Sequence, residues 1–409
     1  MSGAPAHRTS TTTLTVRRPD GSPLAHADVE VEQRRHAVQF GCTGFDAPGL
    51  PGEAHLEELW LGLFDTATLP FYWAGFEPER GRPRTAELLG LARWFADRGV
   101  RLKGHPLAWH SLAPRWLDDL GTDEVEAALR ARIRRDVTDF RGLVGTWDAI
   151  NEVVILPVFD NEAALEGPDR APNALTRLCR ERGRIATVRL AFDEARAADP
   201  GATLVLNDFD LSTAYECLVE GVLEAGVQVD ALGLQTHMHQ GWWGVERTTE
   251  VLDRFARYGL PLHLTETTLL SGDLMPADVE DLNDHQPEHW PSTPEGEARQ
   301  ADELVRHVEA LMAHPSVEAF TYWGLTDTGA WLGAPAGLVR RDGTPKPAYD
   351  ALRSLVRGEW WHARRGYRTD ADGRVRVTGW RGDYALLLGG RSVDFAVTVD
   401  GHADVTLPS

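Results

Sequence analysis

Residues 146–153 read TWDAINEV, a short apolar run that ends in an amide and a carboxylate. Trp147 and Ile150 are typical of a buried strand, but Asn151 and Glu152 stand where further apolar residues would extend it. Buried amides and carboxylates need polar partners. A strand that ends in this way is typical of a parallel β/α barrel, whose functional side chains stand at the carboxyl ends of the strands.

Seven other short apolar segments along the chain also read as strands. They are VQFGCTGF (38–45), LGLFDTATL (61–69), GVRLKGHPLAW (99–109), ATLVLND (202–208), VDALGLQTH (229–237), LPLHLTE (260–266) and VEAFTYWGL (317–325). Helical segments lie between them, such as 85–99 and 186–201, which carry apolar residues at helical spacing and end at glycine. The alternation predicts an α/β fold, a (β/α)8 TIM barrel over residues 39–357. A doubly wound sheet is the competing fold, but no glycine-rich phosphate turn follows the first strand.

Both ends of the chain show the two-residue period of β-strands. Residues 11–38 alternate around Asp20-Gly21 and predict a small N-terminal β-hairpin extension. Residues 358–409 predict a C-terminal all-β module, which we expect to pack on the barrel because about 50 residues of strands would be marginally stable alone. Residues 1–10 are expected to be a disordered tail.

Composition and charge narrow the classes of partner. The net charge of −20 argues against nucleic acid and against an anionic membrane surface. The three cysteines, Cys42, Cys179 and Cys217, are scattered and suggest neither a zinc site nor a disulfide framework. No apolar run reaches the 18 or so residues of a membrane span, and the first residues lack the apolar core of a signal peptide. We therefore expect a cytoplasmic protein without a cofactor or metal.

Polar and aromatic residues gather at the ends of the predicted strands. From the third to the eighth strand they are His105, Trp109 and His110, then Asn151 and Glu152, Asn207 and Asp208, Gln235, His237 and His239, Glu266, and Trp323 and Asp327. In a barrel all these ends converge on one mouth. Two of them carry the carboxylates Glu152 and Glu266. Glycoside hydrolysis needs such a pair, about 5 Å apart for retention of configuration and roughly 6.5 to 9.5 Å apart for inversion.

Several motifs, in a fixed order over about residues 39 to 355, resemble glycoside hydrolase family 10, the retaining endo-β-1,4-xylanases. They are GHPLAWH (104–110), WDAINE (147–152), LNDF (206–209), GLQTHMH (233–239), LTET (264–267), YWGLTDTGAWL (322–332) and TPKPAYDAL (344–352). The resemblance implies that Glu152 is the acid/base and Glu266 the nucleophile, and that the partner is an oligosaccharide or another β-glycoside. The substrate-binding residues expected from the strand ends and these motifs are Asn151, His105, Trp109, Gln235, His237, Asn207, Trp323, Trp331 and Tyr72.

The sequence differs from the family pattern at the second strand, in the stretch TATLPFYWAGFEPERG (66–81). Members of the family carry Glu-Asn-x-x-Lys-Trp before a Glu-Pro pair and grasp the next xylose with it. Here Glu77-Pro78 is present, but Thr68, Leu69 and Tyr72 stand at the three polar positions. We therefore expect altered substrate specificity, with Leu69, Phe71 and Tyr72 lining the site and weak action on long unsubstituted xylan.

Some readings stay open at this point. Trp242, Trp243 and Trp290 follow the sixth and seventh strands and are either sugar platforms or loop anchors. A metal-dependent barrel hydrolase is an alternative function, with His105, His237, His239, His263 and Glu266 as ligands. A non-catalytic carbohydrate-binding barrel is another, because the altered second strand leaves room for a lost substrate.

Overall fold

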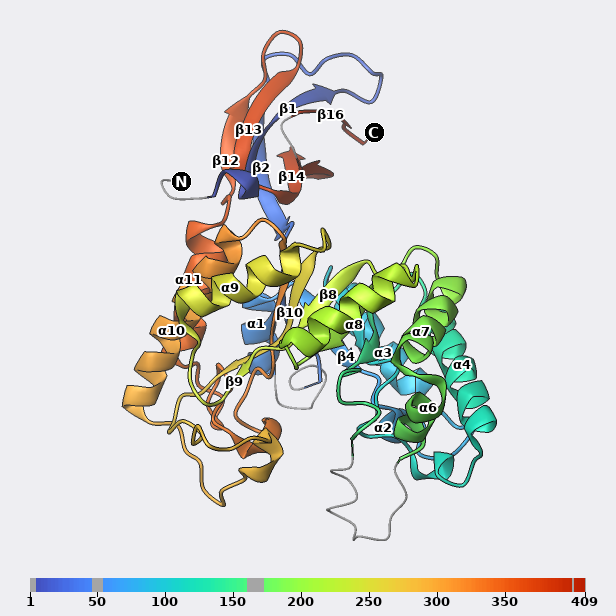
Figure 1. Cartoon of the computed structure of the whole chain (residues 1–409). Helices are drawn as coiled ribbons and strands as arrows, with labels where there is room; N and C mark the ends of the chain where they lie inside the picture. The colour runs from blue at the N-terminus through green and yellow to red at the C-terminus, as the bar shows by residue number, and fades with distance from the viewer. Residues whose placement is uncertain (1–4, 46–53, 160–172, 399–400, 409) are drawn as a thin grey trace.

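The computed structural model describes residues 5–45, 54–159, 173–398 and 401–408. Eight parallel strands of this described chain close into a barrel (Figure 1). In barrel order they are β3 (Gln39–Thr43), β4 (Thr66–Pro70), β5 (Arg101–His105), β6 (Val144–Asn151), β7 (Thr203–Asp208), β8 (Ala231–Leu234), β10 (Leu262–Leu269) and β11 (Val317–Tyr322). Pairing of β11 with β3 closes the ring, and the short β9 (His237–Met238) pairs with the end of β10. The predicted (β/α)8 barrel is confirmed.

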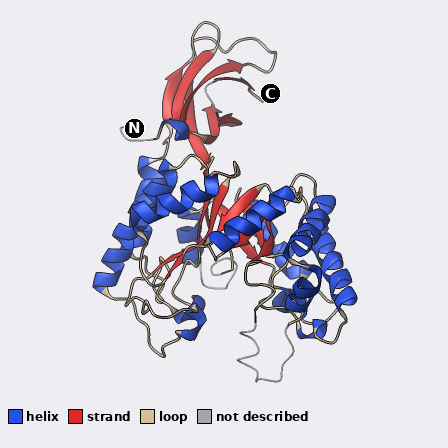
Figure 2. Ribbon diagram, viewed as in Figure 1, coloured by secondary structure: helices blue, strands red, loops and turns tan. Residues whose placement is uncertain are grey.

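Helices surround the barrel (Figure 2). They are α1 (Ala54–Leu63), α2 (Trp73–Phe76), α3 (Thr85–Ala96), α4 (Thr122–Asp139), α6 (Ala174–Arg182), α7 (Arg184–Ala198), α8 (Thr213–Glu224), α9 (Gly244–Ala256), α10 (Pro294–Ala313) and α11 (Pro347–Ser354). Local sequence sets several helix starts. The Ser212 hydroxyl accepts from the Ala214 amide before α8, and Thr293 caps α10, which has proline at its first position. No helix among the described residues is long and apolar enough to cross a bilayer.

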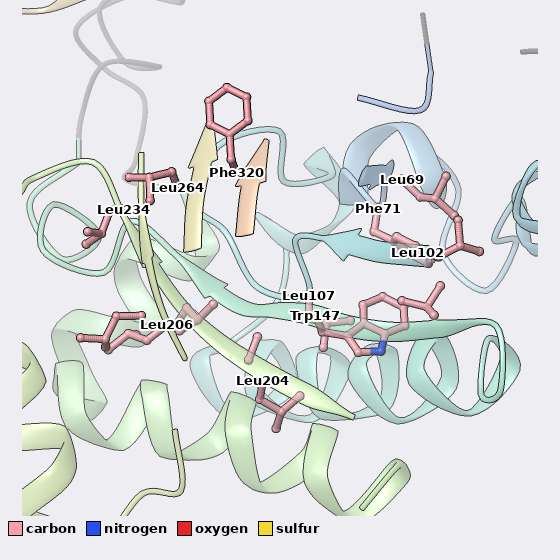
Figure 3. Close-up of a cluster of buried hydrophobic side chains, with 14 of the residues drawn as sticks. Leu69, Phe71, Leu102, Leu107, Trp147, Leu204, Leu206, Leu234, Leu264 and Phe320 are labelled. Carbon is pink, nitrogen blue, oxygen red and sulfur yellow. The ribbon is translucent and has the colours of Figure 1, made fainter. Parts of the chain in front are cut away.

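The hydrophobic core contains apolar side chains of the strands and of the helices that cover them, and Figure 3 shows part of it. Trp147 of β6 is fully buried, and its ring lies 4.7 Å from that of Phe71. The neighbouring strand makes room for this indole with Gly104, where a Cβ would lie 2.2 Å from the Trp147 ring. The core therefore holds the ends of β4, β5 and β6 in fixed positions, and the predicted site residues extend from these ends.

The two ends of the chain together form a second unit of two packed sheets. One sheet has the order β13 (Arg374–Trp380), β1 (Thr9–Arg17), β16 (Gly401–Thr406), and the other β12 (Arg365–Arg368), β2 (Asp28–His36), β14 (Gly382–Leu388), β15 (Arg391–Val397). Apolar residues of both sheets share one core. The predicted N-terminal hairpin is wrong in its pairing, because β1 and β2 belong to different sheets and pair with C-terminal strands. The all-β character of the C-terminal segment is confirmed.

This β unit contacts the barrel on the side opposite the strands' carboxyl ends (Figure 1). Trp380 lies 5.5 Å from Trp360, and a ring nitrogen of His36 lies 2.9 Å from the Val356 carbonyl oxygen. Buried Arg8, in the short helix η1 (Ala6–Arg8), donates to the backbone carbonyl of Val317 at the start of β11. The prediction of a disordered tail over residues 1–10 is therefore wrong for residues 5–10, and residues 1–4 lie outside the described chain. The predicted domain limits stay predictions.

Candidate active site

Glu152 stands at the carboxyl end of β6, within a set of hydrogen-bond donors. Its Oε2 atom accepts a hydrogen bond from Trp109 Nε1 at 2.7 Å. Its Oε1 atom accepts from Asn151 Nδ2 and from Gln235 Nε2, both at 3.1 Å. The Glu152 side chain is 13% exposed, and Nε2 of His110 lies 3.6 Å from Oε2. Residues at the end of β6 and in the segments that follow β5 and β8 thus hold one carboxyl group.

Glu266 lies in β10 and is held from two other strands. Asn207 Nδ2 donates to its Oε1 atom at 3.0 Å. His237 Nε2 lies 3.2 Å from its Oε2 atom, while the other ring nitrogen lies 3.1 Å from the Thr268 hydroxyl. The Glu266 side chain is 7% exposed. The imidazole is therefore fixed between the Glu266 carboxylate and a neutral hydroxyl.

One amide network joins the two carboxyl groups. The Asn151 side-chain carbonyl accepts from Asn207 Nδ2 at 2.7 Å and from Gln235 Nε2 at 3.1 Å. The same two donors reach Glu266 and Glu152 respectively. The two carboxyl groups, 114 positions apart in the sequence, therefore face one site.

The backbone at Glu152 has an unusual conformation. Its φ is +58°, in the left-handed region that residues other than glycine rarely adopt. The end of β7 supports this turn: the Asn207 carbonyl accepts from the Glu152 amide at 2.8 Å, and the Asp208 carboxylate accepts from the Val154 amide at 3.0 Å. Such conformations persist only where the surrounding structure enforces them, and they cluster at functional sites.

The two carboxyl groups have opposite pKa shifts. Burial and the nearby charge of Glu266 raise the pKa of Glu152 to about 8, against the hydrogen bonds from Trp109 and Gln235. Burial also acts to raise the pKa of Glu266, but the positive charge of His105 and the hydrogen bond and charge of His237 outweigh it and lower the pKa below its usual value. Near neutral pH one group is protonated and the other ionised, as acid/base and nucleophile roles require.

These shifts predict a bell-shaped dependence of kcat/KM on pH. Activity should fall as pH decreases through the lowered pKa of Glu266, because the carboxylate becomes protonated. It should also fall as pH increases through about 8, because Glu152 loses its proton. Rates at low concentrations of an aryl β-glycoside, measured from pH 3 to 10, check this. A basic limb that is unchanged in Glu152→Gln would contradict it.

His105 is oriented by two buried charged residues. Its Nδ1 atom lies 2.7 Å from Asp148 Oδ2, and Lys103 Nζ lies 2.9 Å from Asp148 Oδ1. Burial acts to raise the pKa of Asp148, but the charge of Lys103 and the hydrogen bond from His105 lower it. Sequence reasoning did not select Lys103 and Asp148, although each is a charged residue inside an apolar strand, which was a usable signal.

The predicted aromatic residues also lie at this site. Tyr72, Trp109 and Trp323 have ring centroids 5.2 to 6.1 Å from that of His105. Trp331 is 37% exposed and lies 4.7 Å from His237. Phe45, which follows β3 and was not predicted, contacts both Tyr72 and Trp323.

The expectation that Leu69 and Phe71 line the site is wrong. Both side chains are fully buried, and Figure 3 shows them among the core residues. Phe71 packs on Phe140 and on Trp147, whose ring fills the space beside Gly104. The second strand therefore contributes one aromatic ring to the site, that of Tyr72.

Trp242, Trp243 and Trp290, for which two readings were left open above, make the packing contacts that are typical of loop anchors. Trp290 is 8% exposed, lies in a small apolar cluster with Leu270 and Met275, and donates to the Asp273 carbonyl at 2.8 Å. Trp242 donates to His307 at 3.3 Å under the guanidinium of Arg306. Trp243 packs against the barrel core, and its ring lies under the guanidinium of Arg247 in α9.

The alternative metal ligands do not form a metal site. In the part of the chain that the structure describes, no three His, Cys, Asp or Glu side chains are arranged to hold a metal ion. His105 and His237 already have carboxylate partners, in Asp148 and Glu266. His263 is buried within the strand array, where desolvation and the charge of Lys103 lower its pKa to about 3.

A surface cavity of about 610 Å³ lies away from these residues, between α4 and α7. Four of the residues that line it are Arg130, Arg182, Arg184 and Arg189. The guanidinium groups of these arginines already have partners within the protein. Arg130 and Arg182 both form ion pairs with Glu126, and Arg184 and Arg189 donate hydrogen bonds to backbone carbonyls. The cavity contains no predicted site residue.

Known proteins resemble this chain over most of its length. The family model described as glycosyl hydrolase family 10 matches residues 71–355. Endo-1,4-beta-xylanase B of Thermotoga neapolitana is 26% identical over 304 residues, 69% of this chain and 78% of that protein. Endo-1,4-beta-xylanase 3 of Hypocrea jecorina is 24% identical over 69% of this chain and 72% of its own length. The solved structure of a GH10 protein from Paenibacillus barcinonensis superposes with a TM-score of 0.64 at 25% identity, covering 78% of this chain and 96% of that one.

Proposed function

This chain belongs to glycosyl hydrolase family 10 and is a xylanase-like glycoside hydrolase, and from this premise we propose which residues carry the reaction. Glu266 is the nucleophile and Glu152 the acid/base of a retaining double displacement, the mechanism of the family. The observation that supports this assignment is the pair of opposite pKa shifts on two carboxyl groups in one amide network.

In the first step a Glu266 oxygen attacks the anomeric carbon and forms a glycosyl ester. The bond from that carbon to the leaving oxygen breaks, and the Glu152 proton passes to this oxygen. Glu152, now ionised, then takes a proton from water. The resulting hydroxide attacks the anomeric carbon and releases Glu266 as a carboxylate, and Glu152 keeps the proton that it took from water, ready for the next cycle.

The amides around the carboxyl groups bind the sugar that is cleaved. Asn151 lies beside Glu152 and shares donors with Glu266, so its amide is placed for the 2-hydroxyl of this sugar, a contact that strengthens in the transition state. His105, held by Asp148, faces the same sugar. Trp323 and Trp331 give it apolar surface, with Trp331 37% exposed.

The substrate is a β-linked oligosaccharide or polysaccharide. The specificity of the enzyme differs from that of family members that bind xylan with polar residues of the second strand. The relatives named above are endo-1,4-β-xylanases. Here Leu69 is in the core and Thr68 is 1% exposed, so neither offers a polar group to a neighbouring sugar. Tyr72 replaces the expected lysine with a ring.

The test is a screen of β-linked oligosaccharides and aryl β-glycosides, with the anomer of the first product followed by NMR. We expect hydrolysis in which the β-anomer appears first and then mutarotates. Initial release of the α-anomer would contradict retention. Binding of sugars without turnover of any activated aryl glycoside would instead support a non-catalytic barrel.

A further inference from the structure

Four aromatic rings at the mouth of the barrel form a closed set of edge-to-face contacts, which we call the aromatic quartet: Phe45, Tyr72, His105 and Trp323. Successive ring centroids around it lie 6.3, 5.6, 5.2 and 6.3 Å apart, with interplanar angles of 75°, 84°, 76° and 78°. These are the separations and orientations of favourable aromatic pairs. Rings packed at such distances leave no space for a sugar between them.

The quartet spans the depth of the site. His105 is 2% exposed at its base, whereas Phe45 is 40% exposed at its outer edge. Its members follow or end four neighbouring strands, β11, β3, β4 and β5. The quartet is therefore a wall over one half of the barrel mouth, and the carboxyl and amide groups occupy the other half.

The position of Glu152 shows which part of a substrate meets this wall. An acid that protonates the leaving oxygen must lie on the side of the leaving group. Glu152 follows β6, and in the closed ring of eight strands β11 lies opposite β6, and β3 opposite β7. The sugar chain on the other side of the cleaved bond, the non-reducing side, therefore runs toward Trp323, Phe45 and Tyr72.

We infer that the aromatic quartet closes the non-reducing side of the site after one sugar, so that the enzyme removes single sugars from the non-reducing ends of β-glycosides. This inference rests on the proposed function, because the orientation of the substrate depends on Glu152 being the acid. An enzyme that cuts within a chain needs an open path on both sides of the cleaved bond. Here the path on the non-reducing side ends at packed rings, and the polar side chains with which the second strand of family members binds a further sugar are replaced.

The experiment compares kcat/KM for matched 4-nitrophenyl β-glycosides that carry one or two sugars, xylose against xylobiose and glucose against cellobiose. In the series that is hydrolysed, we expect the single-sugar glycoside to be preferred by about tenfold or more. The double variant Phe45→Ala/Tyr72→Ala opens the wall and should lower this preference at least tenfold. With reduced xylotetraose or cellotetraose, the first product of the native enzyme should be a monosaccharide.

Control variants show whether a changed preference for single-sugar glycosides results from loss of the quartet's rings or from an unrelated substitution. Tyr72→Phe keeps the ring and should keep the preference. Trp94→Ala removes a half-buried aromatic side chain of α3 that packs under the Arg98 guanidinium and is not a member of the quartet, and it should also leave the preference unchanged. Preference of the native enzyme for the two-sugar glycosides would overturn the inference but not the proposed function. Absence of hydrolysis in both series, by the native enzyme, would overturn the proposed function itself.

If the double variant does not fold, as judged by near-UV circular dichroism, the single variant Phe45→Ala provides the test, since Phe45 is the most exposed member of the quartet. Its preference for the single-sugar glycoside should fall at least threefold. An unchanged preference in a folded Phe45→Ala protein would contradict the closure of the site by this ring.

Discussion

Glu266→Ala should lower kcat for an aryl β-glycoside by about 10⁴-fold or more, the scale on which a lost nucleophile reduces catalysis. The side chain accepts a hydrogen bond from Asn207 and lies beside His237, and its lowered pKa keeps it ionised at neutral pH. Without it the glycosyl ester cannot form. The amide network and Glu152 would remain, so substrate binding should change far less than turnover.

Added azide distinguishes a lost nucleophile from a damaged protein. In Glu266→Ala a small anion can enter the vacated space and attack the anomeric carbon from the face opposite the leaving group, which gives an α-glycosyl azide. Initial rates with and without azide, and the anomer of the product, are the measurements. Glu216→Gln is the control, since Glu216 is a buried carboxylate paired with Arg254 on the helical layer and should keep native rates. Native rates in Glu266→Ala without azide would refute the assignment.

Local sequence pattern was enough to predict the barrel and the two carboxyl groups. The polar ends of apolar runs, such as Asn151-Glu152 at the end of β6, can be recognised within a few residues of one strand. A parallel barrel then brings every such end to one mouth, so the spatial grouping follows from the fold class. Glu152 and Glu266 were therefore accessible to reasoning from sequence.

Features that depend on pairing or packing between distant segments were not predicted correctly. The strands β1 and β2 have the pattern of a hairpin, but β1 pairs with β13 and β16, whose residues lie more than 350 positions away. Likewise, the sequence around β4 does not show that Leu69 and Phe71 turn into the core, because this depends on packing against rings from distant segments, such as Phe140 and Trp147 around Phe71. Phe45 had no motif to mark it, and only its ring contacts show its place.

Glu152→Ala should have an effect that depends on the leaving group. For an oligosaccharide, whose leaving alcohol needs a proton, we expect kcat/KM to fall by about 10²- to 10⁴-fold, the usual contribution of a general acid. For a dinitrophenyl glycoside the leaving phenolate needs no proton, so kcat/KM, which reports formation of the glycosyl ester, should fall less than about tenfold. The value of kcat for this substrate should fall more, because water then lacks its general base.

The same variant tests the raised pKa of Glu152 directly. The basic limb of the native pH profile, expected near pH 8, should disappear in Glu152→Ala because no group remains whose proton must be kept. Azide should restore turnover of the dinitrophenyl glycoside and give the β-glycosyl azide, since Glu266 still forms the ester and azide then attacks from the face that water would use. Together with the α-product from Glu266→Ala, this would place the two carboxyl groups on opposite faces of the sugar. Equal losses for both leaving groups, or an α-azide product, would show that Glu152 is not the acid.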